Sequence, residues 1–213
     1  MAVPTLIYDD ACPMCKAYTA GFKRVGWCNR TAFSGVVQRA IPAGLDLDRA
    51  RHEIPLVDPA TGIVYYGLDA MTRVMAAGVP ALRPVLRSHL LHALLTPLYK
   101  IITYNRRVIA GTHAPAVGFD CAPDRHRGWR WTYITVMVAF TVWLGLPGLL
   151  SALVAIGGLA GLYIAHDRLN YLGHYVTVIF LAALAINLLP VAIAPLAASL
   201  LIGFETHRRL GKG

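Results

Sequence analysis

The sequence is poor in charge, and its few charges are unevenly placed. Of its 213 residues only 15% are Asp, Glu, Lys or Arg, whereas 56% are hydrophobic, and this is too apolar for an ordinary soluble protein. Sixteen of the 20 basic and nine of the 11 acidic residues come before position 131, and no charged residue occurs from Trp131 to Ala165. The two parts of the chain are therefore expected to lie in different solvents.

Acidic residues are scarcer than basic ones, and the net charge is +9. Such a balance is typical of contact with an anionic membrane surface or with nucleic acid. Because the sequence carries no nucleic-acid-binding motif, we expect a lipid bilayer as partner and no nucleic acid. Met1 to Pro4 includes no basic residue and the first apolar run ends at Tyr8, so we expect no secretory signal and a cytoplasmic first part.

Cysteine is also rare, with four residues in the whole chain. In a reducing compartment so few thiols indicate catalysis or metal binding rather than a framework of structural disulfides. Cys28 and Cys121 have no second thiol at motif spacing. We interpret them as small buried or idle side chains, with a role as an extra resolving thiol as the alternative.

The other two thiols form a Cys-Pro-Met-Cys motif directly after a short apolar run. Residues 5–8 are β-prone and predict a buried strand, two carboxylates follow, and Pro13 stands where a helix can begin without losing a hydrogen bond. Cys12 would then lie at a helix N-terminus, where the unpaired amides stabilise a thiolate. Cys15, three residues on, could resolve a mixed disulfide.

The next segments predict an alternation of helices and strands. Turn chemistry at residues 58–62 favours a hairpin, and Asp69 would cap the helix after it. The expected elements are helices at 16–26, 41–51 and 69–77 and strands at 31–37, 54–57 and 63–66.

Residues 80–111 contain two prolines, Pro84 and Pro97, and leucines and isoleucines at three- and four-residue spacing. This pattern predicts two amphipathic helices with basic faces. Either a lid packed on the sheet or a helix lying on a membrane would fit. His89 and His92 share a face without a nearby Cys or acid, so we interpret them as solvated or packed side chains rather than metal ligands.

The order of these elements resembles the thioredoxin and glutaredoxin fold. More narrowly, YDDACPMC, GLDAM and PLYKIITYNRR resemble the DCC family of thiol-disulfide oxidoreductases, over about residues 3 to 110. The resemblance implies an α/β thioredoxin-like domain at residues 1–111, without cofactor or bound metal.

The same resemblance implies roles for individual residues. Cys12 corresponds to the nucleophile, Cys15 to the resolving thiol, and Asp9 to the family aspartate, which could bind an amide, shuttle the proton of Cys15, or serve only as a turn or cap residue. Pro55 corresponds to a cis proline facing the two sulfurs, with a trans proline at an edge strand as the alternative. Asp10 replaces the usual glycine. Because its negative charge repels the Cys12 thiolate, it is expected to raise the pKa of Cys12 and favour the disulfide.

Beyond a basic linker at residues 112–130, the chain becomes almost wholly apolar. Four runs, at 131–146, 149–165, 171–189 and 191–204, are each close to the length that spans a bilayer core. Basic residues flank only alternate ends of these runs, so the positive-inside rule places both termini in the cytoplasm. We expect an all-α transmembrane bundle of four spans at 131–206 in the inner (cytoplasmic) membrane, with a cytoplasmic tail at 207–213; a soluble helical hairpin is the alternative.

The membrane half has no cysteine, unlike quinone-linked disulfide-forming proteins, which need thiols near the quinone. His166 and His174 lie at the inner end of the second and third runs. Polar residues at such a boundary can bind a quinone or haem. Simple anchoring is the favoured interpretation.

Three functions remain open from the sequence. The first is a membrane-anchored oxidoreductase acting on a protein or low-molecular-weight disulfide through Cys12 and Cys15. The second is a soft-metal module for Cu, Zn or Hg, with Met14 or Cys28 as a further ligand, although two thiols make a poor closed site. The third is a noncatalytic membrane adaptor.

Overall fold

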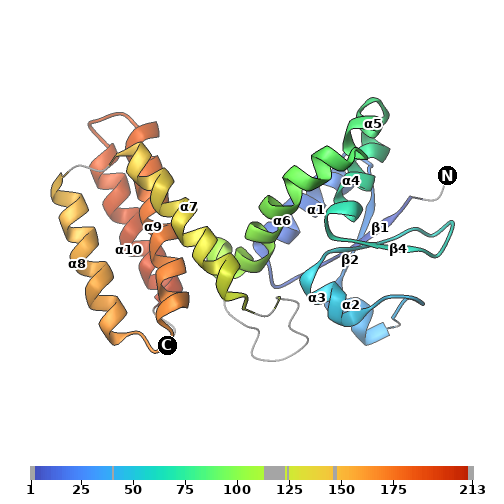
Figure 1. Ribbon diagram of the computed structural model, residues 1–213, viewed down its shortest axis with the longest axis horizontal. Helices are drawn as coiled ribbons and strands as arrows, with labels where there is room; N and C mark the ends of the chain where they lie inside the picture. Colours follow the sequence, from blue (N-terminus) through green and yellow to red (C-terminus); the bar gives the residue numbers. More distant parts are fainter. Residues whose placement is uncertain (1–2, 40, 113–122, 124, 146–147, 211–213) are drawn as a thin grey trace. The chain divides into compact units, whose positions relative to one another are not determined.

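The chain divides into two compact units, Met1–Arg125 and His126–Gly213. The computed structural model describes residues 3–39, 41–112, 123, 125–145 and 148–210. Figure 1 shows that the first unit combines a sheet with helices and that the second is built of helices.

A mixed four-stranded sheet forms the centre of the first unit. Its strands are β1 (Thr5–Tyr8), β2 (Asn29–Ala32), β3 (Pro55–Val57) and β4 (Val64–Tyr66), in the order β2-β1-β3-β4. β1 runs parallel to β2 and antiparallel to β3, which pairs with β4 in turn. This sheet and its helices fit a thioredoxin-like domain, as the sequence predicted.

Helices cover both faces of this sheet. On one face, α2 (Phe33–Arg39) and α3 (Leu47–His52) bury residues of β1 and β4. On the other face, α1 (Pro13–Arg24) and α4 (Gly67–Gly78) cover Leu6 of β1 and Leu56 of β3. Figure 1 shows the two pairs of helices on opposite sides of the strands. The largest fully buried apolar side chains of these two layers are Phe33, Leu6, Leu56 and Val74.

Two of the expected elements differ most from the structure in their bounds. The strand expected at residues 31–37 ends at Ala32, and α2 begins at Phe33. The reason is that Phe33 and Val36, one helical turn apart, are 1% and 7% exposed and pack together with Ile7. The helix expected at 41–51 begins only at Leu47, because the Asp46 carboxylate accepts a hydrogen bond from the amide of Arg49 and caps it.

The hairpin expected around residues 58–62 is confirmed, with Gly62 at φ 70° in its turn. Pro55 opens β3 and pairs with Tyr66. None of the described peptide bonds is cis, so the expected cis proline is wrong. Of the alternative, the trans bond and the position at a strand start are confirmed, whereas the edge position is wrong, because β3 lies between β1 and β4.

The segment after α4 contains one long helix rather than two broken at Pro97. A short turn, η1 (Pro80–Leu82), and α5 (Arg83–Leu86) lead into α6 (His89–Ala110). Ser88 caps the start of α6, and Gly111, at φ 65°, ends it. Pro97 lies inside α6 on its exposed side, and so does Ala93, so the backbone oxygen of Ala93 that loses its donor there is not enclosed in the core.

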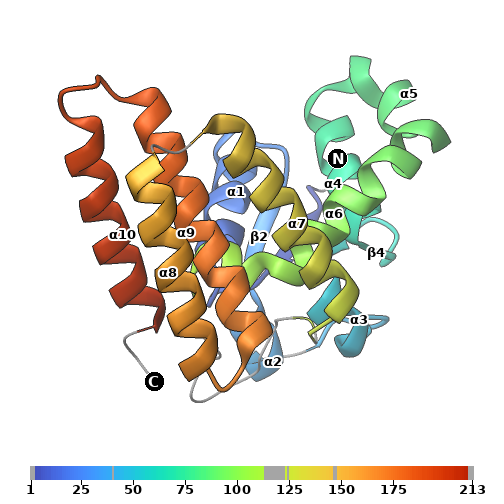
Figure 2. The same cartoon turned by 60° about the vertical axis from the view of Figure 1, so that its left-hand side comes forward.

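The second unit consists of α7 (Arg127–Leu144), α8 (Gly148–Ile164), α9 (Arg168–Leu188) and α10 (Ala194–Leu210). α9 packs against each of the other three, and Figure 2 shows the four lying side by side. Within the described ranges, α9 alone is long and apolar enough to cross a membrane by length and composition. Four spans therefore stay a prediction.

Buried polar contacts join three helices of this unit. The hydroxyls of Tyr133 in α7 and Thr177 in α9 lie 2.7 Å apart. Arg209 in α10 donates to Nδ1 of His174 at 3.3 Å and pairs with Glu205 at 2.7 Å. Because His174 accepts this bond, its Nδ1 carries no proton in this arrangement.

The layered core of the first unit predicts the cost of a cavity in β1. Leu6 is 0% exposed, so Leu6→Ala should lower the free energy of unfolding by about 2–5 kcal/mol. Val3→Ala, at a position 43% exposed, is the control and should change it by less than about 0.5 kcal/mol. Urea unfolding of the full chain, monitored by the protease sensitivity of the first unit, measures both free energies of unfolding. Equal effects of the two substitutions would contradict the assigned core.

Candidate active site

The Cys-Pro-Met-Cys motif lies at the junction of β1 and α1. Cys12 is the N-cap of α1 with extended backbone (φ −98°, ψ 114°), and Pro13 is the first helical residue. The amide of Cys12 donates to the backbone oxygen of Asp9 at 3.3 Å, which closes the turn between strand and helix. Cys15 follows within the first helical turn, so both thiols lie at the positive end of the helix dipole.

The two thiols of this motif have opposite acidities. The pKa of Cys12 is lowered to about 6, chiefly because the Cys15 thiol donates a hydrogen bond to its sulfur. Burial opposes this shift, while the backbone N–H of Cys15 and the charge of Arg106 support it. The pKa of Cys15 is raised, because the same hydrogen bond holds its proton and because it is buried. At neutral pH, Cys12 is therefore mainly a thiolate and Cys15 is a thiol.

Exposure does not distinguish the two thiols. Although it lies at the helix start, Cys12 is only 3% exposed, against 5% for Cys15. Its neighbours Ala11 and Pro13 are exposed, so Cys12 lies just beneath the surface. The difference in acidity comes from the direction of the hydrogen bond between the sulfurs and from nearby charge, not from contact with water.

Arg106, near the end of α6, forms an ion pair with the carboxylate that follows β1. The Arg106 guanidinium lies 3.2 Å from Oδ2 of Asp9, and the two side chains are 11% and 9% exposed. Oδ1 of Asp9 accepts from the amide of Ala11 at 2.9 Å, one residue before Cys12. Arg106 lowers the pKa of both Cys12 and Cys15, whereas Asp9 raises that of Cys12.

Sequence reasoning left Arg106 without a role and did not place it in the site. It stands 97 positions after Asp9, and the only hint was the family resemblance of the Tyr-Asn-Arg stretch at 104–106. Tyr18 was also missed: one turn after Cys15, it donates a hydrogen bond to the Cys15 sulfur, and burial is the main cause that raises its own pKa. Neither residue belongs to a recognisable local motif.

The second carboxylate, Asp10, has another partner. Its oxygens accept hydrogen bonds from the hydroxyl of Ser34 at 2.9 Å and from the amide of Ser34 at 3.3 Å, at the start of α2. The carboxylate that raises the pKa of Cys12 is Asp9. The expected opposition to the thiolate is thus a property of Asp9, and Asp10 fixes the turn to α2.

A small cavity of about 10 Å³ separates the resolving thiol from the ion pair. Cys15, Asp9 and Arg106 line it together with Ile54, the residue before Pro55. A space of this size holds at most one water molecule. Cys15 and Asp9 therefore border one small cavity.

The remaining candidates are not gathered at this site. Cys28 is 2% exposed among apolar side chains, and burial raises its pKa to about 11, so it is an inert core residue. Cys121 lies outside the described residues. His92 faces the backbone oxygen of Leu86 at 3.2 Å and packs against α4. In the part of the chain that the structure describes, no three His, Cys, Asp or Glu side chains cluster as a metal site.

The two histidines considered for a quinone or haem, His166 and His174, lie in different environments. His166 is exposed in the turn before α9, whereas His174 is 3% exposed beside Arg209. A quinone or haem role for either histidine stays a prediction.

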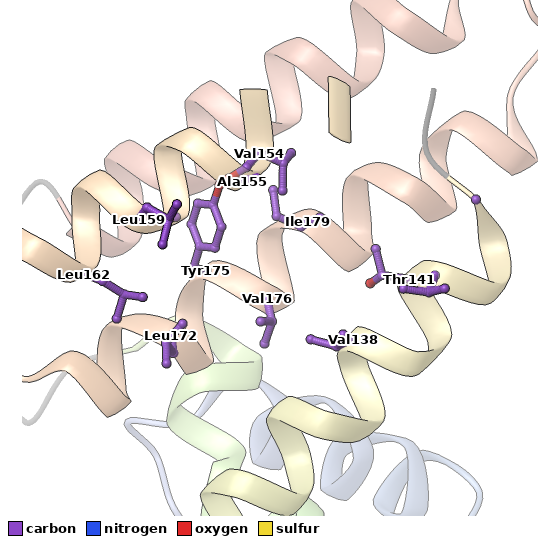
Figure 3. Close-up of a pocket in the computed structure, with 13 residues that line it drawn as sticks. Val138, Thr141, Val154, Ala155, Leu159, Leu162, Leu172, Tyr175, Val176 and Ile179 are labelled. Carbon is purple, nitrogen blue, oxygen red and sulfur yellow. Dashed lines mark hydrogen bonds between the residues drawn. The ribbon is translucent and has the colours of Figure 1, made fainter. Parts of the chain in front are cut away.

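A cavity of about 720 Å³ lies between α7, α8 and α9 of the second unit (Figure 3). Its lining is almost entirely aliphatic. The hydroxyls of Thr141 and Tyr175, which also line it, donate to the backbone oxygens of Met137 and Val154. Because no acid, base or thiol is among its lining residues, it suits an apolar molecule but offers no group for catalysis.

Comparison with known families gives one match. The family of DCC1-like thiol-disulfide oxidoreductases matches residues 6–112, half of the chain, and the match includes Cys12, Cys15, Asp9 and Arg106. No curated protein and no solved structure matches the chain.

The ion pair predicts opposite effects of its two members on the nucleophile. Arg106→Gln removes a positive charge and leaves Asp9 facing the thiols, so the pKa of Cys12 should rise from about 6 by roughly one unit or more. Asp9→Asn should lower it, because the carboxylate opposes the thiolate. Alkylation rates of Cys12 against pH, read by peptide mass spectrometry, give both values. Arg107→Gln is the control, and shifts in the same direction would contradict the assignment.

Proposed function

Since the chain belongs to the family of DCC1-like thiol-disulfide oxidoreductases, we propose that it is a membrane-anchored enzyme that reduces or exchanges disulfides through Cys12 and Cys15. The observation that carries this proposal is the pairing of one acidic and one protonated thiol at the start of α1. Thiol-disulfide exchange needs this inequality, because the first sulfur must attack while the second keeps its proton.

The reaction begins at Cys12. Its thiolate attacks one sulfur of the substrate disulfide; the substrate S–S bond breaks, a mixed disulfide with Cys12 forms, and the departing substrate thiolate takes a proton from solvent. The Cys15 thiol then loses its proton and attacks the Cys12 sulfur. The substrate leaves as a dithiol, and Cys12 and Cys15 are joined in a disulfide. Two equivalents of a cytoplasmic thiol return this disulfide to the dithiol and are oxidised in its place.

Asp9 and Arg106 act on the second step, the attack of Cys15 on the Cys12 sulfur. The shared cavity with Cys15 supports Asp9 as the acceptor of the Cys15 proton, either directly or through one water molecule. Arg106 is ion-paired with Asp9, so we assign it a positioning role. Its charge favours the thiolate at Cys12.

The order of attack can be tested by trapping. With Cys28 and Cys121 replaced by serine, Cys15→Ser should accumulate mixed disulfides with substrate, since Cys12 attacks and no thiol resolves the product. Cys12→Ser in the same background should accumulate far fewer, because Cys15 is protonated. Nonreducing electrophoresis and mass spectrometry of the adducts measure both. More adducts at Cys15 than at Cys12 would reverse the assigned roles.

We further propose that the helical unit anchors the enzyme in the cytoplasmic membrane by four spans. Its support is the apolar composition of residues 131–204, the suitability of α9 as a span, and the placement of basic residues. Arg125, Arg127 and Arg130 precede or begin α7, Arg168 begins α9, and Arg208 and Arg209 end α10, while the turns between α7 and α8 and between α9 and α10 carry no charge.

This arrangement predicts the side on which three places lie. Residues 1–130 and 207–213 should share the cytoplasmic face, and Gly148 should face the outside. Engineered cysteines in a cysteine-free background, labelled with an impermeant maleimide on intact cells, distinguish these sides. A cysteine at Gly148 should react at once, whereas those at Val25 and His207 should need permeabilisation. Labelling of Gly148 only after permeabilisation would refute four spans.

A further inference from the structure

α6 presents a continuous apolar face to its surroundings. Leu90, Leu94, Leu98 and Ile102 follow one another at four-residue intervals and are 72%, 65%, 52% and 43% exposed. Ala93 and Pro97, which lie beside them by helical periodicity, are exposed too. Apolar patches of this continuity are rare on the free surface of soluble domains and mark a contact with another apolar surface.

The opposite side of α6 is firmly packed, so the exposure does not come from a poorly anchored helix. His92 contacts the backbone oxygen of Leu86 at 3.2 Å. The hydroxyl of Tyr99 accepts from the amide of Ile54 at 3.4 Å, and Arg106 is ion-paired with Asp9. The helix is thus fixed along its length with its leucines directed away from the sheet.

The Asp, Glu, Lys and Arg residues of α6 and of the segment before it are all basic. No Asp or Glu occurs from Ala70 to Phe119. Arg83 and Arg87 precede α6 and are exposed, next to the exposed apolar Leu82 and Val85. Within α6, Lys100 follows Ala93 by two turns and therefore borders the apolar face, where a lysine can extend its amine to a polar boundary. An apolar stripe with basic residues beside it on the same helix and in the segment before it is complementary to a surface of anionic headgroups above acyl chains.

We propose that the apolar face of α6, formed by Leu90, Ala93, Leu94, Pro97, Leu98 and Ile102, lies on the surface of an anionic lipid bilayer. The leucines enter the boundary between headgroups and acyl chains, and Arg83, Arg87 and Lys100 contact the headgroup phosphates. This goes beyond anchoring by the second unit, because it gives the thioredoxin-like unit a membrane contact of its own. It rests on the proposed membrane location but not on the thiol chemistry.

The consequence concerns the active site. The helix that lies on the bilayer also carries Arg106, which is ion-paired with Asp9 beneath the dithiol. Contact with the bilayer therefore holds the dithiol at a fixed position relative to the membrane surface, which favours disulfides of membrane-bound or membrane-associated partners.

Photocrosslinking of the full chain tests this contact. p-Benzoylphenylalanine is introduced in place of Leu94, or as control in place of Val25, which is 58% exposed at the end of α1. Each protein is reconstituted in vesicles of phosphatidylcholine alone or of phosphatidylcholine with phosphatidylglycerol. We expect lipid adducts at position 94, in higher yield with phosphatidylglycerol, and few at position 25.

Every other pattern overturns the proposal. Adducts from position 94 to residues 126–213 would show that the helical unit covers this face, and adducts to a second chain would show self-association. Equal lipid labelling at positions 25 and 94, labelling that does not depend on phosphatidylglycerol, or no adduct would each contradict an anionic membrane contact.

A charge variant gives a second measurement, which tests the basic residues rather than the apolar ones. Arg87→Gln with Lys100→Gln should lower the lipid adduct yield of the Leu94 probe by about fivefold for each charge removed. The matched control, Lys23→Gln with Arg24→Gln at the end of α1, should leave it unchanged. The trapping of mixed disulfides at Cys12 is read separately in the same proteins, so loss of the lipid contact is distinguishable from loss of the thiol chemistry.

Discussion

The ion pair between Asp9 and Arg106 connects the two ends of the thioredoxin-like unit. Asp9 stands at the end of β1 and Arg106 near the end of α6, and both side chains are about nine-tenths buried. Two buried charges lose hydration that only close pairing can offset. The path of α6 across the domain is therefore tied to the turn that carries the dithiol.

That pairing acts on a dithiol already made unequal by local geometry. Pro13 begins α1 directly after Cys12, so the first free amides and the Cys15 thiol are directed at one sulfur. Burial works against the thiolate, and Asp9 does so as well. The hydrogen bond from Cys15, helped by Arg106, outweighs both, and the result is one nucleophile and one proton-bearing partner in nearly equal exposure.

The sequence predicted those parts of the fold and site that depend on neighbouring residues. β1, the start of α1 and the β3–β4 hairpin follow from β-prone runs, proline at a helix start and turn residues. The predicted strand at 31–37 was wrong beyond Ala32, because burial of Phe33 and Val36 favours a helix. The predicted break at Pro97 was also wrong, since the ring lies on an exposed side of α6. Arg106 could not be assigned from local pattern, as its partner is 97 positions away.

We infer that the charge of Arg106 stabilises the reduced form of the dithiol. Redox titration of the Cys12–Cys15 pair in the full chain against glutathione buffers tests it most directly, with Arg106→Gln compared to the native protein and Arg107→Gln as control. Loss of Arg106 should make the reduction potential more negative, by about 30 mV for each pKa unit by which the Cys12 thiolate is destabilised. An unchanged or less negative potential would contradict the account.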